Sequence, residues 1–201
     1  MKKLLFVLFV ISFSLNGFSQ TAEDYYNNGN SKWQQLNYTS AIAEYSKAIE
    51  INPGFVNAYC FRGSVKECLK DFRGAISDYN KVIEIDPNNA VAYKSRGCAM
   101  SKLQEFAGAI KDFDKAIEIF PYYEEAYFNR GIAKISINDF EGSISDCTKT
   151  IEINPKNAKA YYFRGLGKIF LKMKDSGCLD LSKAGELGYT EAYDYIKDFC
   201  K

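Results

Sequence analysis

The sequence predicts an all-α fold, a solenoid of stacked antiparallel helix pairs, from three regularities. Apolar residues recur at helical spacing, as in Ile76, Tyr79 and Ile83. Glycine recurs every 34 residues, at Gly29, Gly63, Gly97, Gly131 and Gly165. The four prolines are also 34 residues apart, at Pro53, Pro87, Pro121 and Pro155. A fixed period of this length is typical of a stacked array, because one helix pair cannot bury its own apolar face.

The N-terminal residues 1–19 carry the pattern of a cleaved secretory signal. Two lysines precede the apolar stretch Leu4–Leu15, and Gly17 and Ser19 are the small residues before a cut at Gln20. This stretch is shorter than the roughly 20 residues that a membrane-spanning helix needs. We therefore expect export to the periplasm or the extracellular space, with no stable membrane span after the signal is removed.

The repeated units begin at Ala22. We predict an array over residues 20–189, closed by a capping helix at 190–201. Its repeats are expected at 22–55, 56–89, 90–123 and 124–157, with a degenerate fifth unit at 158–191. Each unit holds two helices of about 14 residues. The recurring glycine costs a helix about 1 kcal/mol relative to alanine, which indicates that a neighbouring helix comes too close for a β-carbon.

The unit resembles the tetratricopeptide repeat (TPR). Counted from Ala22, position 4 is tyrosine and position 8 is glycine in all five units, and position 32 is proline in the first four. Position 24 is aromatic in the first three units, at Tyr45, Tyr79 and Phe113, and positions 20 and 27 hold small residues. These are signature positions of the family. The resemblance implies a right-handed α-solenoid, the TPR superhelix, and residues 180–196 look like Sel1-type relatives of the family.

Composition argues against nucleic acid as a partner and against catalysis. Lysine and arginine total 26 and aspartate and glutamate 25, so no basic surplus is available for phosphates. Histidine is absent, which removes the commonest general base and metal ligand. Serines such as Ser64 therefore lack a base, and the glycines recur singly rather than in a phosphate-binding loop. No CxxC pair occurs. We expect no catalytic residue, no metal site and no cofactor.

Two charged positions recur with the same period. Arginine occupies position 7, at Arg62, Arg96, Arg130 and Arg164. Aspartate occupies position 23, at Asp78, Asp112, Asp146 and Asp180. If the two helices of a unit pack antiparallel, as in the family, these side chains pair across the hairpin. The alternative is a stripe of unpaired arginines that binds anions.

Six cysteines in an exported chain favour disulfide formation. Cys178 and Cys200 are the favoured pair, because the capping helix should pack on the helix that carries Cys178. A disulfide there would stabilise a terminus that otherwise frays, by about 3 kcal/mol.

The other four cysteines belong to the array. Cys60 and Cys98 lie on neighbouring first helices and form an alternative second pair. Cys68 and Cys147 are expected to be small buried hydrophobic residues.

The resemblance also implies where a partner binds. In the family, the first helix of each unit, the A helix, lines a concave groove through positions 2, 5, 6, 9 and 12. Carried onto this sequence, the candidate groove residues are Tyr26, Asn30, Asn57, Phe61, Lys94, Phe128, Asn129, Ile132, Lys159, Tyr162, Phe163 and Leu166. They become largely apolar towards the C-terminus, which favours an extended or helical partner with apolar side chains. The alternative is that the capping helix covers some of them.

One subgroup of the family grips the C-terminal carboxylate of its partner. Lys94, Asn129 and Lys159 match that pattern, whereas Cys98 and Phe163 do not. The cytosolic chaperones that this clamp recognises would not meet an exported protein. We therefore favour the apolar interpretation of the groove.

The sequence thus predicts a non-catalytic protein–protein interaction scaffold of the cell envelope that binds a peptide or protein segment in its groove. The alternative is a structural subunit that assembles with copies of itself into a homo-oligomer. A third class, an enzyme that combines acidic residues such as Asp112 and Glu125 with a borrowed metal, would require metal-dependent turnover.

Overall fold

The computed structural model describes residues 20–200, a range without strands; the expected signal sequence lies outside it. Five A helices alternate with five B helices. The A helices are α1 (Ala22–Gln34), α3 (Val56–Cys68), α5 (Ala90–Lys102), α7 (Glu124–Ser136) and α9 (Ala158–Phe170). The B helices are α2 (Tyr38–Ile51), α4 (Phe72–Ile85), α6 (Phe106–Ile119), α8 (Phe140–Ile153) and α10 (Lys174–Glu186). A last short helix, α11, spans Ala192–Phe199.

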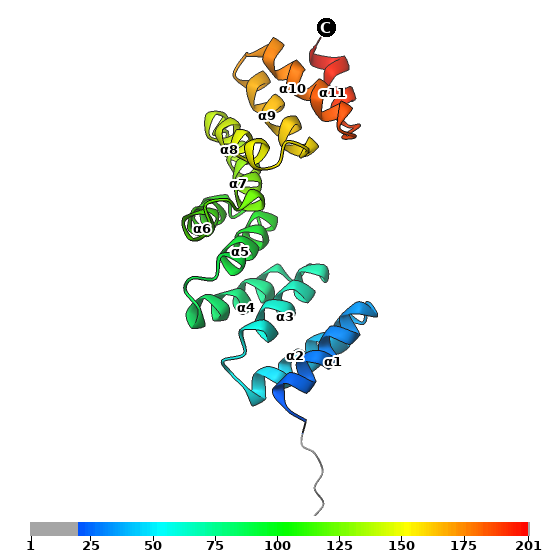
Figure 1. Cartoon of the computed structure of the whole chain (residues 1–201), viewed down its shortest axis with the longest axis vertical. Helices are drawn as coiled ribbons and strands as arrows, with labels where there is room; N and C mark the ends of the chain where they lie inside the picture. Colours follow the sequence, from blue (N-terminus) through cyan, green and yellow to red (C-terminus); the bar gives the residue numbers. More distant parts are fainter. Residues whose placement is uncertain (1–19, 201) are drawn as a thin grey trace, which may run out of the picture.

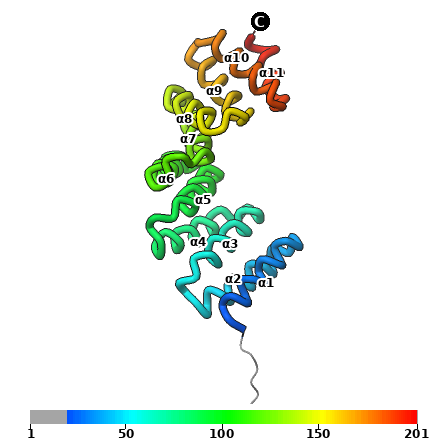
Figure 2. The backbone as a smooth tube through the Cα atoms, in the orientation of Figure 1, coloured from blue at the N-terminus to red at the C-terminus, as the bar shows by residue number. Residues whose placement is uncertain are grey.

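The helices follow one another along an elongated, curved rod, with α1 at one end and α11 at the other (Figures 1 and 2). Every helix packs on the next one along the chain. The predicted all-α solenoid is confirmed. A helices also touch across neighbouring pairs, α5 with α7 and α7 with α9. Elements on the inside of a curve lie closest together, so the A helices form the inner wall of the rod.

The recurring glycine lies where the B helix presses on the A helix. A Cβ added at Gly97 would be 2.8 Å from Cε1 of Phe113, whose side chain is completely buried. Tyrosines fill the same position in the first two units. In the fifth unit, Gly165 instead meets the carbonyl oxygen of Gly177, which an added Cβ would approach to 2.9 Å. The interpretation of these glycines as close helix contacts is confirmed.

A left-handed residue reverses the chain between the helices of each pair. Its φ is between 58° and 63°, at Leu36, Lys70, Gln104, Asn138 and Lys172. The next amide then bonds back into the preceding helix, as from the N–H of Asp71 to the carbonyl of Lys66 at 2.9 Å. This tight reversal makes the two helices of each pair antiparallel.

The position-7 arginines and position-23 aspartates pair across four hairpins. Each guanidinium donates through Nε and Nη2 to both carboxylate oxygens, at 2.6–3.0 Å. The pairs are Arg62–Asp78, Arg96–Asp112, Arg130–Asp146 and Arg164–Asp180. The remaining nitrogen, Nη1, reaches position 25 of the preceding B helix, as from Arg130 to Asp114 at 2.6 Å. Each arginine therefore joins three helices, and the structural interpretation of this ladder is confirmed.

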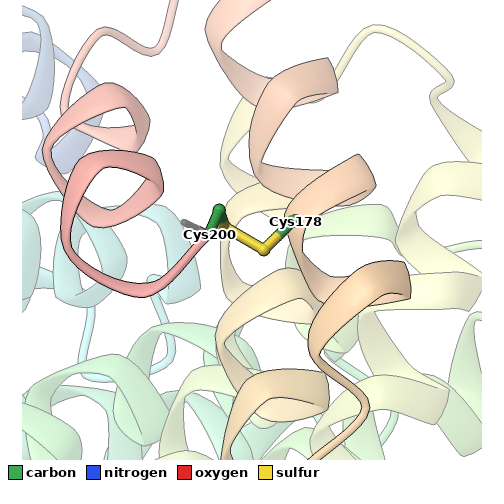
Figure 3. Close-up of a disulfide and its surroundings, with 2 residues drawn as sticks. All are labelled: Cys178 and Cys200. Carbon is green, nitrogen blue, oxygen red and sulfur yellow. A yellow bond between two sulfur atoms is a disulfide. The ribbon is translucent and has the colours of Figure 1, made fainter.

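The array closes with α11, which packs on α10. Ala192 of α11 is buried with Leu181 and Ala184 of α10. A disulfide joins Cys200, directly after α11, to Cys178 in α10, with their Cα atoms 5.8 Å apart (Figure 3). The last helix is therefore attached covalently at its far end.

The other four cysteines are free thiols. Cys147 is buried, as expected. Cys68 is exposed, contrary to expectation, because it ends α3 at the edge of the array and borders a surface hollow. Cys60 and Cys98 are half-buried and form no second disulfide.

Replacing Gly97 by Ala should destabilise the fold by about 1–3 kcal/mol, because the new methyl group would overlap the Phe113 ring. Gly54→Ala is the matched control: its Cβ would meet only Asn52 Oδ1, at 3.4 Å. Urea denaturation measures both free energies of unfolding. Equal effects of the two substitutions would contradict the close contact.

Replacing Arg96 by Met should cost more stability than replacing Arg130 by Met. Asp146 would keep its ion pair with Lys134 at 2.9 Å in the second variant. In the third unit Met100 replaces that lysine, so Asp112 would lose the single ion pair that residues 20–200 offer it. Because a buried, unpaired charge costs about 3–5 kcal/mol, we expect a loss of that order for Arg96→Met. Equal losses in urea denaturation would show that the lysines contribute nothing.

Candidate protein-binding groove

The twelve predicted groove residues all lie on A helices, but their exposure differs. Asn57 and Lys159 are exposed, and Tyr162 and Leu166 are buried. The other eight are half-buried. The inner wall is therefore a partly filled surface, whose accessible parts are a series of hollows between successive A helices.

The first hollow is an apolar recess of about 440 Å³ beside the first two A helices. It is lined by Asn30, Trp33, Gln34, Leu36 and Phe61. The rings of Trp33 and Phe61 meet edge to face, with centroids 5.4 Å apart. Leu36 is 71% exposed and has a left-handed backbone, where the other four units carry polar residues. An exposed leucine in this conformation is costly, so the first hollow carries apolar surface that the fold does not require.

Aromatic side chains pack around Phe61, which lines the first hollow. Tyr26 packs edge to face against Phe61, with centroids 5.5 Å apart, and also contacts the buried Tyr45. The hydroxyl of Tyr45 donates to Oδ1 of Asn30 at 2.8 Å. Burial raises the pKa of Tyr45 to about 12, so this hydroxyl stays protonated and remains a donor at neutral pH. The predicted residues Tyr26, Asn30 and Phe61 are thus brought together.

The central hollow, of about 570 Å³, lies between α3 and α5. It is lined by Glu67, Cys68, Lys70, Phe72, Cys98 and Lys102. Lys94 and Lys102 lie on the same face of α5 as Cys98, because residues four apart on a helix share a face. Within residues 20–200, neither lysine has a carboxylate within ion-pair distance.

Glu67 is the acidic group of the central hollow. Its carboxylate accepts a hydrogen bond from the hydroxyl of Tyr79 at 3.2 Å. Burial raises the pKa of Glu67, and the Tyr79 bond and the charges of Lys94 and Lys102 act in the opposite direction. The central hollow therefore offers a ligand the ammonium of Lys102 and the constrained carboxylate of Glu67, with Lys94 one helical turn before Cys98 along α5.

The residues that match the carboxylate clamp do not converge. The ammonium of Lys94 lies over the ring of Tyr123, 6.0 Å from its centroid. The amide of Asn129 donates to the carbonyl of Glu125 on its own helix, at 2.7 Å. Lys159 is exposed, and in the described part of the chain no contact joins these three residues. A smaller recess between α5 and α7 brings Asn129 and Ile132 beside Lys102.

The C-terminal part of the predicted groove is closed. Phe128 and Phe163 contact each other with centroids 5.9 Å apart and stay half-buried. Tyr162 and Leu166 are each only 8% exposed. They belong to the apolar cluster that α11 completes through Ala192. The expectation that these two residues line an open groove therefore does not hold, because the capping helix covers them.

The sequence reasoning missed an aromatic rim at the junction of the third and fourth units. We define the aromatic rim as Val91, Phe120, Tyr122 and Tyr123. Phe120 is 49% exposed, Tyr122 70% and Val91 55%. Val91 lies on α5, whereas the three aromatic residues lie in the connection between α6 and α7. Lys94 connects these two parts of the rim, because it lies one helical turn after Val91 and over the ring of Tyr123.

The aromatic rim differs from the corresponding residues of the other units at positions 31 and 2. At position 31, Asn52, Asp86 and Asn154 each accept a hydrogen bond from the amide two residues later. Phe120 occupies this position and cannot accept one. Position 2 is polar or charged in the other four units, where the third has Val91. Lining up the repeats position by position would have revealed both departures.

The described residues show no arrangement suited to a metal ion. No group of three or more potential ligand side chains gathers within residues 20–200. None of the helices in this range has the length and apolar character needed to cross a membrane.

The helix pairs described above match a known family of repeat proteins. A model of the tetratricopeptide repeat matches residues 22–55, 56–89 and 124–157. The chain belongs to the tetratricopeptide-repeat family. TPR proteins are in general non-catalytic scaffolds for interactions between proteins. Among curated proteins, none matches this TPR chain in sequence.

Solved structures show the same architecture. A crystal structure of MamA is 26% identical over 82% of this chain and 96% of its own, with a TM-score of 0.77. A structure of MamA from Desulfovibrio magneticus RS-1 is 17% identical over 86% of this chain and 97% of its own, with a TM-score of 0.80. YrrB, described as a TPR protein with an unusual peptide-binding site, is 22% identical over 88% and 92%, with a TM-score of 0.76. The last two show the fold alone.

The double substitution Val91→Asn with Tyr122→Lys should leave stability unchanged within about 0.5 kcal/mol, because both side chains are more than half exposed. These polar residues stand at the same positions of other units, at Asn57 and Lys156. Thermal and urea denaturation measure the effect. A loss well above this value would show that the aromatic rim supports the fold rather than forming a free surface.

Proposed function

We propose that this TPR chain is a scaffold of the cell envelope that holds an extended peptide or protein segment along the inner wall formed by its A helices. The single observation that carries the proposal is the series of open hollows on this wall, of about 440, 570 and 250 Å³, which follow one another from α1 to α7. Hollows that follow one another along one wall suit successive side chains of one bound segment.

The chemistry of the hollows indicates what the segment carries. The first hollow is lined mainly by Trp33, Leu36 and Phe61, so it accepts an aromatic or large aliphatic side chain. In the central hollow, Lys102 lacks an ion pair among the described residues, and so does Lys94, one helical turn before Cys98 of the lining. The two lysines favour a carboxylate or another acceptor beside that apolar anchor. We therefore propose a partner segment with an apolar anchor followed by an acidic residue.

The aromatic rim extends this surface at the middle of the rod. Phe120 and Tyr122 expose large apolar area where the other junctions have turn-forming polar residues. Exposed aromatic side chains are enriched where proteins bind one another. Lys94 lies one helical turn before Cys98, which lines the central hollow, so one partner can contact both the rim and the hollow.

Two features support the envelope setting. Residues 1–19 have the sequence pattern of a secretory signal. The Cys178–Cys200 disulfide suits an oxidising compartment, because such bonds form and persist there and are rare in the cytosol.

The test is crosslinking of the chain in its own cells, with partners identified by mass spectrometry. Lys102→Glu should abolish crosslinks to the groove-bound partner, because it reverses the charge that faces the segment. Lys111→Glu on α6 is the matched control, since Lys111 is exposed on a B helix and should keep the partner. If Lys102→Glu and Leu36→Gln, which removes the exposed leucine from the first hollow, both retain every crosslinked partner, the groove is not the binding surface.

Purified chain provides a second readout. Trp33 is the single tryptophan of the chain and lines the first hollow, so its fluorescence should shift when the identified segment binds. Sedimentation addresses the alternative of a self-assembling subunit. A tight oligomer that buries the A helices would contradict groove binding, whereas a monomer at micromolar concentration would contradict self-assembly.

A further inference from the structure

The capping helix α11 lacks the arginine contacts that hold α3, α5, α7 and α9 of the inner wall. It occupies the place of a sixth A helix, but position 7 is Asp198 where α3, α5, α7 and α9 carry the ladder arginine. It therefore cannot make the arginine bond to position 25 of the preceding B helix, which is Ser182 in α10. The disulfide between Cys178 and Cys200 provides the link between α10 and the end of α11 instead.

Intrinsic stability of α11 is low. It has 8 residues, whereas the other helices have 13 or 14. Glu191, the N-cap residue that precedes it, makes no capping hydrogen bond through its side chain. Isolated helices below about 12–15 residues are marginal in water, so α11 depends on the surface beneath it and on the disulfide.

The surface beneath α11 is a preformed seat for an apolar helix. We define the helix seat as Tyr162, Leu166, Leu181, Ala184 and Gly185. The first four are part of one buried apolar cluster, completed by Ala192 of α11 and flanked by Ile196. Gly185 leaves room for the ring of Tyr193, since a Cβ there would lie 2.6 Å from its Cζ. The helix seat thus fits a helix with small, aliphatic and aromatic residues on one face.

The helix seat continues the inner wall. Tyr162 and Leu166 stand at positions 5 and 9 of α9, where the other A helices face the groove. A row of ring contacts runs from Phe128 to Phe163, Tyr162 and Tyr195, with successive centroids 5.9, 5.2 and 5.6 Å apart. Without α11, the accessible wall would extend from α7 onto α9 and α10.

We propose that the helix seat is a second binding surface, for an amphipathic helix with an aromatic face, which α11 occupies while the Cys178–Cys200 disulfide is closed. A dithiol reductant opens it: its two thiols give two electrons and two protons to the disulfide, which becomes two cysteine thiols, and the reductant becomes a disulfide. α11 is then attached covalently only through the connection at residues 187–191, and no covalent bond holds its far end. A partner helix then competes with a helix that is covalently attached at one end instead of two.

The chemistry of this partner is taken from its present occupant. α11 presents Ala192, Tyr195 and Ile196 to the helix seat and its surroundings, while Asp194, Lys197 and Asp198 are exposed. A segment with this alternation fits the same apolar surface and leaves its charges in water. The inference stands apart from the open groove, because the helix seat lies beyond the hollows that carry the proposed function.

Amide hydrogen exchange of the full chain tests the gate without any partner. Dithiothreitol should speed exchange in residues 192–199 by at least about tenfold and leave α2 and α4 unchanged. Cys200→Ser should exchange at the fast rate without reductant, and Cys60→Ser, which alters a free thiol, should behave as the unaltered chain. Unchanged exchange in α11 overturns the proposal, and so does faster exchange throughout the array, which would mean general unfolding.

A labelled peptide of residues 189–199 tests the helix seat. Fluorescence anisotropy should show binding at least about tenfold tighter to the reduced chain than to the oxidised chain, because α11 no longer holds the site firmly. The peptide with Ile196→Asp should lose this binding, since a charge would be placed against the apolar cluster. Equal binding of the peptide to both redox states, or none to either, overturns the proposal. The result of this test does not depend on whether the groove-dependent crosslinks described above are found.

Discussion

The three-way contact of the position-7 arginine is the constraint on which the regular stacking depends. One planar guanidinium fixes two carboxylate oxygens of its own B helix and one oxygen of the preceding B helix, so it sets the orientation within a pair and between pairs. The tyrosine at position 4 lies against the same guanidinium, with ring centroids 5.3–5.5 Å from its central carbon. Because this arrangement recurs every 34 residues, the A helices are brought together along one curved wall.

That regularity also makes each departure from it meaningful. In the first, second and fourth units, the junction has a turn-forming side chain such as Asn154, and position 2 is polar. The aromatic rim replaces both without burying the new side chains, as the exposure of Phe120 and Val91 shows. Leu36 departs in the same way beside the first hollow. In the function we propose, these exposed apolar side chains contact the bound partner.

The two ends of the inner wall differ in how far they are covered. At the N-terminal end, Trp33 and Phe61 leave an open recess, and the lysines of α5 add unpaired charge next to it. At the C-terminal end, α11 fills the wall and is secured by a disulfide where the ladder arginine is missing. Under the two proposals made above, the scaffold combines an open binding region with a closed one whose cover depends on thiol chemistry.

The sequence by itself determined the helix pairs, their period, the arginine ladder and the family, because these depend on local patterns that repeat at fixed spacing. It also singled out Cys178 and Cys200, since adjacent helices must pack. Only the tertiary structure decided which groove positions are accessible. Tyr162 and Leu166 follow the groove pattern but are covered, and Cys68 is exposed although its residue type favours burial. Accessibility depends on which distant segment packs over a side chain and on where the array ends, and neither is encoded in the period of a single repeat.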